Sequence, residues 1–316
     1  MIPPMLLDVG LIAIGFVLLW KGSEYFVTAA AEVARRIGVS DLVIGLTLVS
    51  LSTTLPEFVA STMASYAGSG GIAVGNAVGS NITNIAFILG TCMILEGYKV
   101  EPLVLKRYGI ALLSVCLLFV LFAMGGITRI EGVLLLSIFV GYMIILSREK
   151  HTRREMREAT KEMRGIPVEP SWKVMGRLLI GVASVFIGAR LLVDSAINIA
   201  ASLNVLESAI GSTIVALGTS LPEFAVSLRA LRENYEQISV GNILGANTFN
   251  MLWVIGFSAL INPLELDRNL LYFNVPVMIG ITILLLIFIR TGYQLKRKEG
   301  IVFIIIYILF LIKNYY

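Results

Sequence analysis

Apolar residues fill most of this chain in long segments that short polar stretches separate. A membrane-spanning helix needs roughly 20 mostly apolar residues, so each segment predicts one span. The pattern therefore predicts an all-α integral membrane protein with ten transmembrane helices. Charged residues, Gly or Pro bound the segments, which cover residues 6–34, 42–66, 72–96, 106–124, 129–147, 174–201, 208–229, 238–261, 270–290 and 299–314.

The longest polar stretch, residues 148–171, separates the first five segments from the last five. It contains seven basic residues and the only histidine, His151. Such a charge run predicts a solvated linker, with a regulatory or lipid-headgroup role as the alternative. The predicted organisation is a first repeat over 1–147 with helices 1–5, a basic linker over 148–172, and a second repeat over 173–316 with helices 6–10.

The distribution of Lys and Arg predicts the orientation, because basic residues favour the cytoplasmic side of a membrane. With ten spans, twenty of the 25 basic residues fall on the side of the linker. The opposite side holds only Arg129, Arg268 and Lys313, while Lys21 and Arg190 lie within spans. We therefore expect a multi-pass protein of the cell membrane, with a cytoplasmic linker and both termini outside.

The two halves contain a repeated stretch, Gly45–Asn84 and Gly211–Asn250, at a constant offset of 166 residues. The first copy reads IGLTLVSLSTTLPEF and then GNAVGSNITN, and the second reads IGSTIVALGTSLPEF and then GNILGANTFN. Because each half has an odd number of spans, the second half enters the membrane from the opposite side. Inverted repeats of this kind are typical of secondary transporters, whose site lies at the midplane between the copies.

Composition agrees with a membrane protein and argues against a soluble one. The chain is 57% hydrophobic and 15% charged, whereas soluble domains average about 25% charged residues. The mean hydropathy is +0.87. Since most of the chain is expected in a lipid bilayer, the net charge of +4 gives no reason to expect nucleic acid as a partner. The oligomeric state is not predicted.

Two long spans carry charged residues near their centres. Lys21 and Glu24 are three residues apart, and Arg190 and Asp194 are four apart, so each pair can neutralise itself on one helix face. A gating role is the alternative for these charges. Glu24 and Arg190 occupy equivalent repeat positions but have opposite charge, so the symmetry does not make them a site.

Each repeat places a glutamate directly after a proline inside an apolar span. Pro56 cannot donate a hydrogen bond to the carbonyl of Ser52, and Pro222 cannot donate one to Gly218. A freed carbonyl within a membrane needs a partner or a polar cavity. We therefore predict a helix break at each motif, which supplies carbonyl and hydroxyl oxygens beside Glu57 or Glu223.

These groups are hard oxygen ligands, which suit calcium, magnesium, manganese or sodium rather than copper or zinc. Two glutamates match the charge of one divalent ion. Calcium accepts about 6–8 oxygens in irregular geometry, whereas magnesium requires a near-ideal octahedron. A mixed set of carboxylates, carbonyls and hydroxyls therefore fits calcium best.

The second part of each motif supplies small residues and amides. Gly75, Gly79, Gly241 and Gly245 have the spacing of close helix contacts. For Asn76 and Asn242 we expect hydrogen bonds between helices, with ion ligation as the alternative. For Asn84 and Asn250 we expect ion ligation, because the repeat places both at matching depth.

With its paired STTLPEF and GTSLPEF motifs, the chain resembles the calcium/cation antiporter superfamily over both halves. The resemblance implies ten helices in two inverted five-helix repeats, ions among helices 2, 3, 7 and 8, and alternating access by sliding of helices 1 and 6. The implied ion ligands are Ser50 (carbonyl), Thr53, Glu57, Ser80 and Asn84 in the first copy, and Ala216 (carbonyl), Thr219, Ser220, Glu223 and Asn250 in the second.

The resemblance leaves two coupling ions open. The LPE form of the motif favours sodium, because proton/calcium members more often carry the glutamate in a GNxxE pattern. Two departures argue the other way. Asn250 stands where some sodium/calcium members have an acid, and Ala246 stands where they often have a serine. Two carboxylates could also exchange one calcium for two protons.

The sequence therefore predicts a secondary antiporter that exchanges calcium for sodium, with a proton/calcium exchanger as the alternative. Calcium and the coupling cation are transported substrates, and no cofactor is expected. A passive cation channel is a further alternative, although predicted helix breaks are more typical of an occluded transporter site. An intramembrane enzyme is disfavoured, because it would need a base near a nucleophile and the only histidine lies in the linker.

Overall fold

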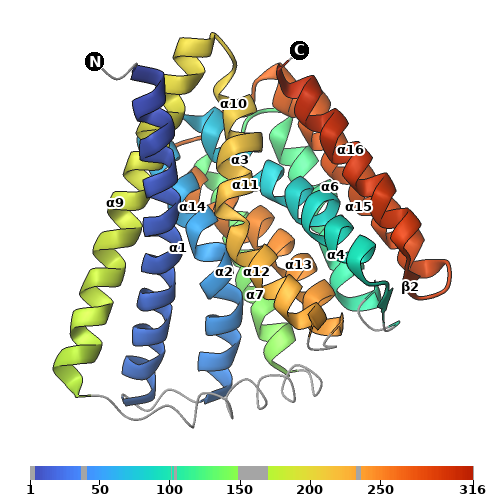
Figure 1. The fold of residues 1–316 in the computed structure, drawn as a ribbon, viewed down its shortest axis with the longest axis horizontal. Helices are drawn as coiled ribbons and strands as arrows, with labels where there is room; N and C mark the ends of the chain where they lie inside the picture. Colours follow the sequence, from blue (N-terminus) through green and yellow to red (C-terminus); the bar gives the residue numbers. More distant parts are fainter. Residues whose placement is uncertain are drawn as a thin grey trace.

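The computed structural model describes residues 4–36, 41–100, 102, 105–148, 170–232 and 236–315, which form a helical bundle (Figure 1). The first half consists of α1 (Pro4–Arg36), α2 (Asp41–Tyr66), α3 (Gly70–Ile82), η1 (Thr83–Leu89), α4 (Gly90–Leu95), β1 (Tyr98–Lys99), η2 (Leu105–Gly109), α6 (Ile110–Ala123) and α7 (Arg129–Arg148). The elements labelled η are π-helical turns.

The second half follows a similar order of elements. It consists of α9 (Ser171–Leu203), α10 (Glu207–Ile210), η3 (Gly211–Val215), α11 (Ala216–Thr219), α12 (Leu221–Arg232), α13 (Glu236–Phe249), η4 (Asn250–Val254), α14 (Ile255–Ile261), η5 (Leu270–Asn274), α15 (Val275–Arg290), β2 (Gln294–Leu295) and α16 (Arg297–Tyr315). Four of these elements, α10 to α12 with η3, correspond to α2, and the strand of this half comes one helix later.

Every predicted apolar segment coincides with one helix or with consecutive helical stretches. Within the described residues, six helices are long and apolar enough to cross a membrane. The count becomes seven if Glu207–Thr219 and Leu221–Leu228, which meet at a 41° bend, form one span. This measure finds six or seven candidate spans in the described part of the chain and does not confirm ten. Ile110–Ala123, for example, is apolar but shorter than a full span.

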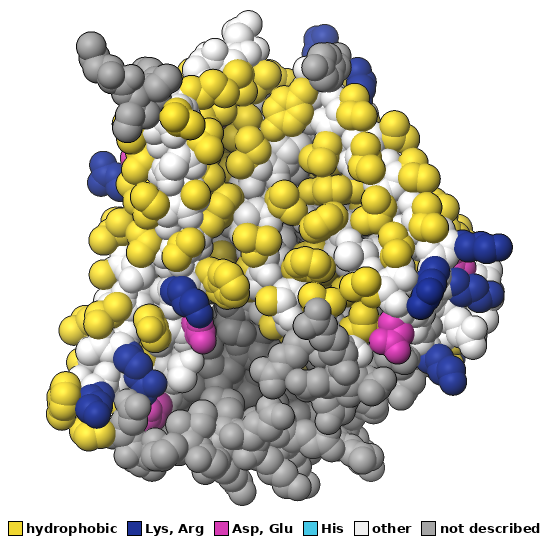
Figure 2. Space-filling model, viewed as in Figure 1, with side chains coloured by type: hydrophobic (Ala, Val, Ile, Leu, Met, Phe, Trp, Pro, Cys, Tyr) yellow, Lys and Arg dark blue, Asp and Glu magenta, His cyan; other side chains and the backbone are white. Residues whose placement is uncertain are grey.

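The surface of the bundle is that of a multi-pass membrane protein. Large apolar side chains are exposed along α1, α7, α9 and α16. Hydrophobic side chains cover the middle of the face in Figure 2, whereas Lys and Arg lie around its edges, mostly at the left and right sides of the lower half. In Figure 1 the first turn of α1 and the last turn of α16 lie at one end of the bundle, and the end of α7 and the start of α9 lie at the other.

The helices α1 and α9 lie side by side and touch through glycines. A Cβ on Gly15 would be 2.8 Å from the carbonyl oxygen of Gly188, and a Cβ on Gly181 would be 3.0 Å from that of Gly22. Gly15 and Gly181 occupy equivalent repeat positions, as do Gly22 and Gly188. The two contacts are therefore the same contact made twice, with the roles of the halves exchanged.

Two short β-pairings in the segments between helices also join one half to the other. Strand β1 pairs antiparallel with β2, so Tyr98 lies opposite Leu295. Ile127 forms a bridge with Leu264, and each accepts a hydrogen bond from the other, of 2.8 and 2.9 Å. Tyr98 and Leu264 are equivalent repeat positions, but their partners, Leu295 and Ile127, are not, so the two pairings correspond only after a register shift of two residues.

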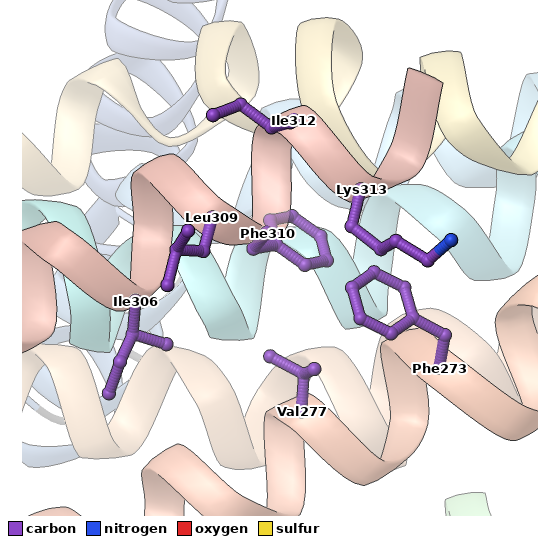
Figure 3. Close-up of a pocket in the computed structure, with 7 residues that line it drawn as sticks. All are labelled: Phe273, Val277, Ile306, Leu309, Phe310, Ile312 and Lys313. Carbon is purple, nitrogen blue, oxygen red and sulfur yellow. The ribbon is translucent and has the colours of Figure 1, made fainter. Parts of the chain in front are cut away.

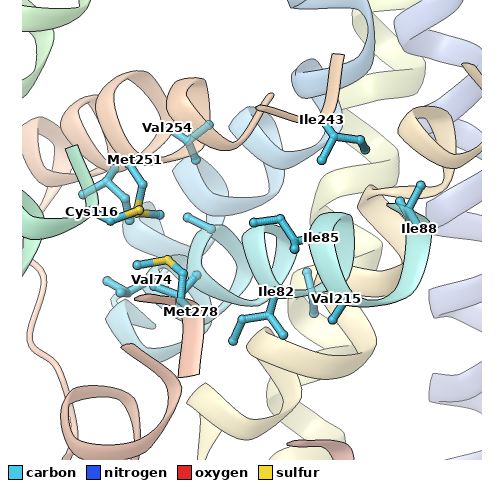
Figure 4. Close-up of a cluster of buried hydrophobic side chains, with 14 of the residues drawn as sticks. Val74, Ile82, Ile85, Ile88, Cys116, Val215, Ile243, Met251, Val254 and Met278 are labelled. Carbon is cyan, nitrogen blue, oxygen red and sulfur yellow. The ribbon is translucent and has the colours of Figure 1, made fainter. Parts of the chain in front are cut away.

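The core of the bundle is apolar and surrounds the repeated motifs. Side chains from α3, η1, η3, α13, η4 and α15 meet in one buried cluster (Figure 4). Its members include Ile82, Ile85, Val215, Met251 and Met278, each fully or almost fully buried. A low-dielectric shell of this kind makes any unneutralised charge inside it costly.

An open groove between α15 and α16 lies apart from the motifs. Its lining is apolar except for one charged side chain, Lys313 near the end of α16 (Figure 3). Phe273 and Val277 form one wall, and Ile306 and Phe310 form the opposite one. Because the groove contains no carboxylate, it does not offer a site for a divalent cation.

Replacing Gly188 by Ala is expected to lower the stability of the protein. The new methyl group would lie 2.8 Å from the Gly15 carbonyl oxygen and 2.9 Å from Cβ of Leu18. Such overpacking typically costs about 1–3 kcal/mol. Gly176→Ala in the same helix is the matched control, since a Cβ there has no neighbour within 4 Å. Equal thermal unfolding temperatures for the two variants in detergent would contradict the close contact.

Candidate functional site

The two LPE motifs differ in backbone structure. In the second copy, α11 ends at Thr219, Ser220 has φ −83° and ψ 5°, and α12 starts at Leu221 after a 41° bend. In the first copy, α2 continues through Pro56 without interruption. The predicted break is therefore correct for the second motif and wrong for the first. A proline removes only one backbone hydrogen bond, and the neighbouring bonds can carry the helix past it.

A phenylalanine from another helix packs against the backbone just before the bend of the second copy. A Cβ on Gly218 would lie 1.8 Å from Cζ of Phe16. The ring of Phe16 on α1 therefore occupies the space beside the Gly218 backbone that any side chain would need. The equivalent residue of the first copy is Ser52, whose side chain lies outside the described residues.

Both motif glutamates are completely buried. Glu57 and Glu223 have 0% of their surface exposed, and no other charged residue in the described part of the chain is classed as buried. Their carboxyl groups are close enough to interact electrostatically. The hydroxyl of Ser220 donates a hydrogen bond of 3.0 Å to Oε1 of Glu57. The bent segment of the second copy thus reaches the carboxyl group of the first.

The motif threonines also connect the copies. Thr53 lies near the Glu223 carboxyl group, and Thr219 lies near that of Glu57. The Thr219 hydroxyl lies 3.0 Å from Oδ1 of Asn76 and 3.3 Å from the carbonyl oxygen of Ala216. That carbonyl also accepts a hydrogen bond of 3.1 Å from the Ser220 amide. The Ser50 carbonyl belongs to α2, while the Ser50 side chain lies outside the described residues.

Asn84 and Asn250 both lie in π-helical turns, η1 and η4. A π-helical turn contains an extra residue, which widens the helix, and such turns are frequent at functional sites. Nothing in the sequence pattern indicated these turns. The equivalence of Asn84 and Asn250 in the repeat is the one signal that could have suggested a shared local distortion.

A set of four asparagines holds these turns together across the two halves. Nδ2 of Asn81 donates to the carbonyl oxygen of Asn247 at 3.2 Å, and Nδ2 of Asn247 donates to that of Asn81 at 3.1 Å. Nδ2 of Asn84 donates to Oδ1 of Asn247 at 2.9 Å, and Nδ2 of Asn250 donates to Oδ1 of Asn81 at 3.1 Å. These bonds fix the side-chain amides of Asn84 and Asn250 and leave their Oδ1 atoms unpaired.

Several predicted ligands have buried oxygens without any hydrogen-bond partner. Buried polar atoms are nearly always paired, so such a concentration needs an explanation, and an ion-binding site is one. The unpartnered oxygens of the predicted ligands are Glu57 Oε2, Glu223 Oε1 and Oε2, Ser80 Oγ, Asn84 Oδ1 and Asn250 Oδ1. They number about as many as the 6–8 oxygens that calcium accepts.

Asn76 has the structural role that the sequence favoured. Its Nδ2 donates to the Glu57 carbonyl oxygen at 3.2 Å and to Oγ of Ser61 at 2.9 Å. It therefore links α3 to α2 at the backbone of Glu57. The equivalent Asn242 has an Nδ2 without a partner, so the two copies differ here.

Contacts between aromatic rings hold each motif against the opposite half. Phe58 follows Glu57 and stacks on Trp253 of η4, with ring centroids 4.1 Å apart. Phe224 follows Glu223 and packs on Phe87 of η1 at 5.7 Å. Phe87 and Trp253 are equivalent repeat positions, three residues after the two π-helical asparagines. Each glutamate is thus positioned by an aromatic contact with the other repeat.

The charged pairs within α1 and α9 form as predicted and do not belong to this site. Lys21 and Glu24 lie 2.9 Å apart, and Arg190 and Asp194 lie 3.5 Å apart. All four side chains are more than half exposed. Asn198 also donates a hydrogen bond of 3.2 Å to Asp8, which links α9 to α1.

Comparison with known proteins identifies the family. The family model described as sodium/calcium exchanger protein matches residues 7–148 and 173–316. The chain belongs to the sodium/calcium exchanger family. This family consists of membrane exchangers rather than enzymes. The segment between the matched ranges coincides with the predicted basic linker.

Relatives match the chain along almost its whole length. The sodium/calcium exchanger MaX1 of Methanosarcina acetivorans is 35% identical, over 97% of this chain and 98% of that protein. The inner membrane protein YrbG of Escherichia coli is 34% identical, over 94% and 93%. A structure of the sodium–calcium exchanger NCX_Mj soaked with Na⁺ and Sr²⁺ superposes with a TM-score of 0.63 at 32% identity, over 96% of this chain and 97% of that one.

Gly218→Ala is expected to destabilise this exchanger, and Phe16→Ala should relieve the effect. The added methyl group would overlap the Phe16 ring, which lies as close as 1.8 Å to its position. Overpacking costs about 1–3 kcal/mol, and residues in direct contact give non-additive effects. Thermal unfolding of both single variants and the double variant measures this coupling. Additive effects would show that Phe16 does not occupy the space beside Gly218.

Proposed function

We propose that this protein is a secondary antiporter that exchanges calcium for sodium by alternating access. The observation that carries the proposal is the pair of fully buried carboxylates, Glu57 and Glu223, whose oxygens are mostly unpaired. A buried carboxylate is unfavourable unless it is neutralised or paired with a cation. The site is therefore suited to a bound cation in its working cycle.

The proposed ligand shell combines both repeats. Glu57 and Glu223 supply the charge, and the unpaired oxygens of Ser80, Asn84 and Asn250 add neutral ligands. The remaining proposed ligands lie on the two LPE motifs: the Ser50 and Ala216 carbonyls and the hydroxyls of Thr53, Thr219 and Ser220. A mixed oxygen shell without sulfur or nitrogen favours calcium over zinc or copper.

The charge of the site explains why transport would be an exchange. With no cation bound, two ionised carboxylates place a charge of −2 inside the apolar core. Moving a single unneutralised ion into such an environment costs several kcal/mol even after relaxation. The unloaded protein would then change conformation very slowly. Loaded with calcium or with monovalent cations, the site is neutralised and can be presented to the other side.

The proposed topology is ten spans in two inverted five-helix repeats, with both termini outside and the linker inside. The reciprocal contacts of Gly15 with Gly188 and of Asn81 with Asn247 support it, because an axis that exchanges the halves produces such pairs. The start of α1 and the end of α16 also lie at one end of the bundle (Figure 1). The excess of Lys and Arg on the linker side favours this orientation.

Sodium is the proposed coupling ion because the family description and the relative MaX1 are both named for sodium/calcium exchange. The LPE form of both motifs agrees with this choice. Coupling to protons is the alternative, since Asn250 and Ala246 remove ligands that some sodium/calcium members have. In that case a glutamate would take up a proton when calcium leaves.

Calcium uptake into vesicles should be driven by an outward sodium gradient. Purified protein is reconstituted, and uptake is measured under an imposed sodium gradient, an imposed pH gradient, or neither. Uptake driven only by the pH gradient would replace sodium by protons as the coupling ion. Calcium flux that needs no counter-ion would instead indicate a passive channel and would overturn the proposal.

Glu57→Gln and Glu223→Gln should each abolish calcium transport while the protein stays folded. Each change halves the charge facing a divalent ion, and loss of a buried charge partner costs about 3–5 kcal/mol, which is over a hundredfold in affinity. Glu24→Gln is the matched control, since Glu24 is 57% exposed and pairs with Lys21 on α1. Calcium transport retained by both site variants would remove the two glutamates from the site.

A further inference from the structure

We propose that the open groove between α15 and α16 binds one anionic phospholipid of the surrounding membrane. An acyl chain of the lipid lies along the groove, and its headgroup phosphate lies at Lys313. The groove has a volume of about 470 Å³, within the range of about 300–1,000 Å³ that is typical of ligand sites. It lies outside the ion site, so binding of the lipid does not depend on the proposed transport function.

The groove is apolar along its length and charged at one end. In Figure 3, Phe273 and Val277 of α15 face Phe310 of α16, and the Lys313 side chain lies beside Phe273. Ile306, at the other end, comes seven residues before Lys313, so the groove extends about 10 Å along α16. Such a groove matches a ligand with an apolar tail and an anionic head.

The position of the groove along α16 matches one leaflet of a membrane. Lys313 lies in the last turn of α16, which ends at Tyr315. The hydrocarbon core is about 30 Å thick, so one leaflet takes up about 15 Å and accommodates the whole groove. Large apolar side chains at the groove are exposed, as in a surface that faces lipid: Tyr272 is 74%, Leu309 is 59% and Ile312 is 53% exposed. Lys313 is therefore placed where phospholipid headgroups begin.

A second cation lies close to the charged end of the groove. Arg268 directly precedes Asn269 in the chain. Nδ2 of Asn269 donates a hydrogen bond of 3.1 Å to Oδ1 of Asn314, which follows Lys313. Neither Lys313 nor Arg268 forms an ion pair with any residue that the structure describes. The acid nearest in sequence, Asp267, accepts a hydrogen bond of 2.8 Å from a backbone amide of η5. Both cations can therefore attract a phosphate group.

These charges argue against a second copy of the chain as the occupant. Symmetric dimers use the same surface patch on both subunits. A dimer formed through this groove would bring Lys313 and Arg268 of both copies to one interface, where like charges repel. A phospholipid phosphate instead has the opposite charge, and basic pockets between transmembrane helices bind such headgroups.

One wall of the groove is connected to the π-helical turn η1 of the ion site. The ring of Phe310 packs on that of Tyr307, which stacks on Phe87 of η1 with centroids 5.4 Å apart. The Tyr307 hydroxyl also lies 3.3 Å from the hydroxyl of Thr83, which precedes Asn84. A ligand that packs against Phe310 therefore acts on the position of η1.

The same helix is bonded to η3 of the second repeat. The Ser212 hydroxyl donates a hydrogen bond of 3.3 Å to Oδ1 of Asn314, and the hydroxyls of Thr213 and Tyr315 lie 2.6 Å apart. Ala216, which supplies a proposed carbonyl ligand, directly follows η3. A lipid that holds α16 against α15 should therefore keep both turns in place and support ion exchange. This consequence rests on the proposed function, whereas the binding site does not.

The binding test uses the purified full chain in a mild non-ionic detergent. Phosphatidylglycerol, which is anionic, or phosphatidylcholine, which has no net charge, is titrated into the protein, and native mass spectrometry counts the bound lipids. We expect one phosphatidylglycerol to bind more tightly than phosphatidylcholine.

Two pairs of variants test the position of the lipid. Lys313→Gln should weaken phosphatidylglycerol binding about fivefold, because it removes one cation at the membrane surface. Lys298→Gln, at the opposite end of α16, is its matched control and should bind as the wild type does. Ile306→Trp should fill the groove and prevent binding. Ile305→Trp is its control, because Ile305 is 51% exposed and does not line the groove.

Three results would overturn the site. Equal affinity of the wild type for the two lipids would show nonspecific contact with bulk lipid only. Equal affinities of Lys313→Gln and Lys298→Gln for phosphatidylglycerol would place the headgroup elsewhere. A dimer of the wild type that Ile306→Trp abolishes and Ile305→Trp retains would assign the groove to a second copy of the chain.

Calcium uptake into vesicles tests the link to the ion site. The vesicles contain phosphatidylcholine with or without phosphatidylglycerol, and a sodium gradient drives uptake. Phosphatidylglycerol should raise the uptake rate of the wild type and of Ile305→Trp, and this increase should be lost in Ile306→Trp. Equal increases in the two tryptophan variants would overturn the link. Absence of uptake by the wild type in all vesicles would instead reject the proposed function and leave the result on lipid binding standing.

Discussion

Two carboxylates buried together in an apolar bundle are the constraint on which this structure depends. Glu57 and Glu223 are fully buried, and most of their oxygens have no partner in the protein. A protein that only had to be stable would replace such a pair by apolar residues at little or no loss. The surrounding structure is best understood as what keeps both acids in place while their oxygens stay free: asparagine bonds, aromatic stacking and a bent helix, each joining one repeat to the other.

The reciprocity of these contacts has a simple geometric origin. When two equivalent segments face each other across an axis, a contact between one position and another is repeated with the halves exchanged. The asparagine pairs, the glycine contacts and the aromatic pairs all follow this rule. The exceptions carry information as well. Phe16 packs against Gly218 beside the bend of the second copy, whereas α2 continues through Pro56 in the first copy. This departure from symmetry lies beside the glutamates.

The sequence predicted the helical membrane class, the position of every helical segment and the burial of both acids, because hydropathy and an offset of 166 residues are properties of the chain itself. It failed where tertiary packing decides. Pro56 does not break α2, since the remaining backbone bonds suffice. The π-helical turns at Asn84 and Asn250 were not predicted, because no local pattern specifies an extra residue per turn. The fit of Phe16 against Gly218 depends on residues 202 positions apart in the chain, and no periodicity connects them.

The contact between α1 and α9 has a mechanical consequence. At Gly15 and Gly188, and again at Gly22 and Gly181, the two backbones touch with no side chain between them. Because α1 and α9 are in direct backbone contact at two separate points, neither helix can rotate independently, and a displacement of one must move the other. In the proposed alternating-access cycle, α1 and α9 would therefore move as one body.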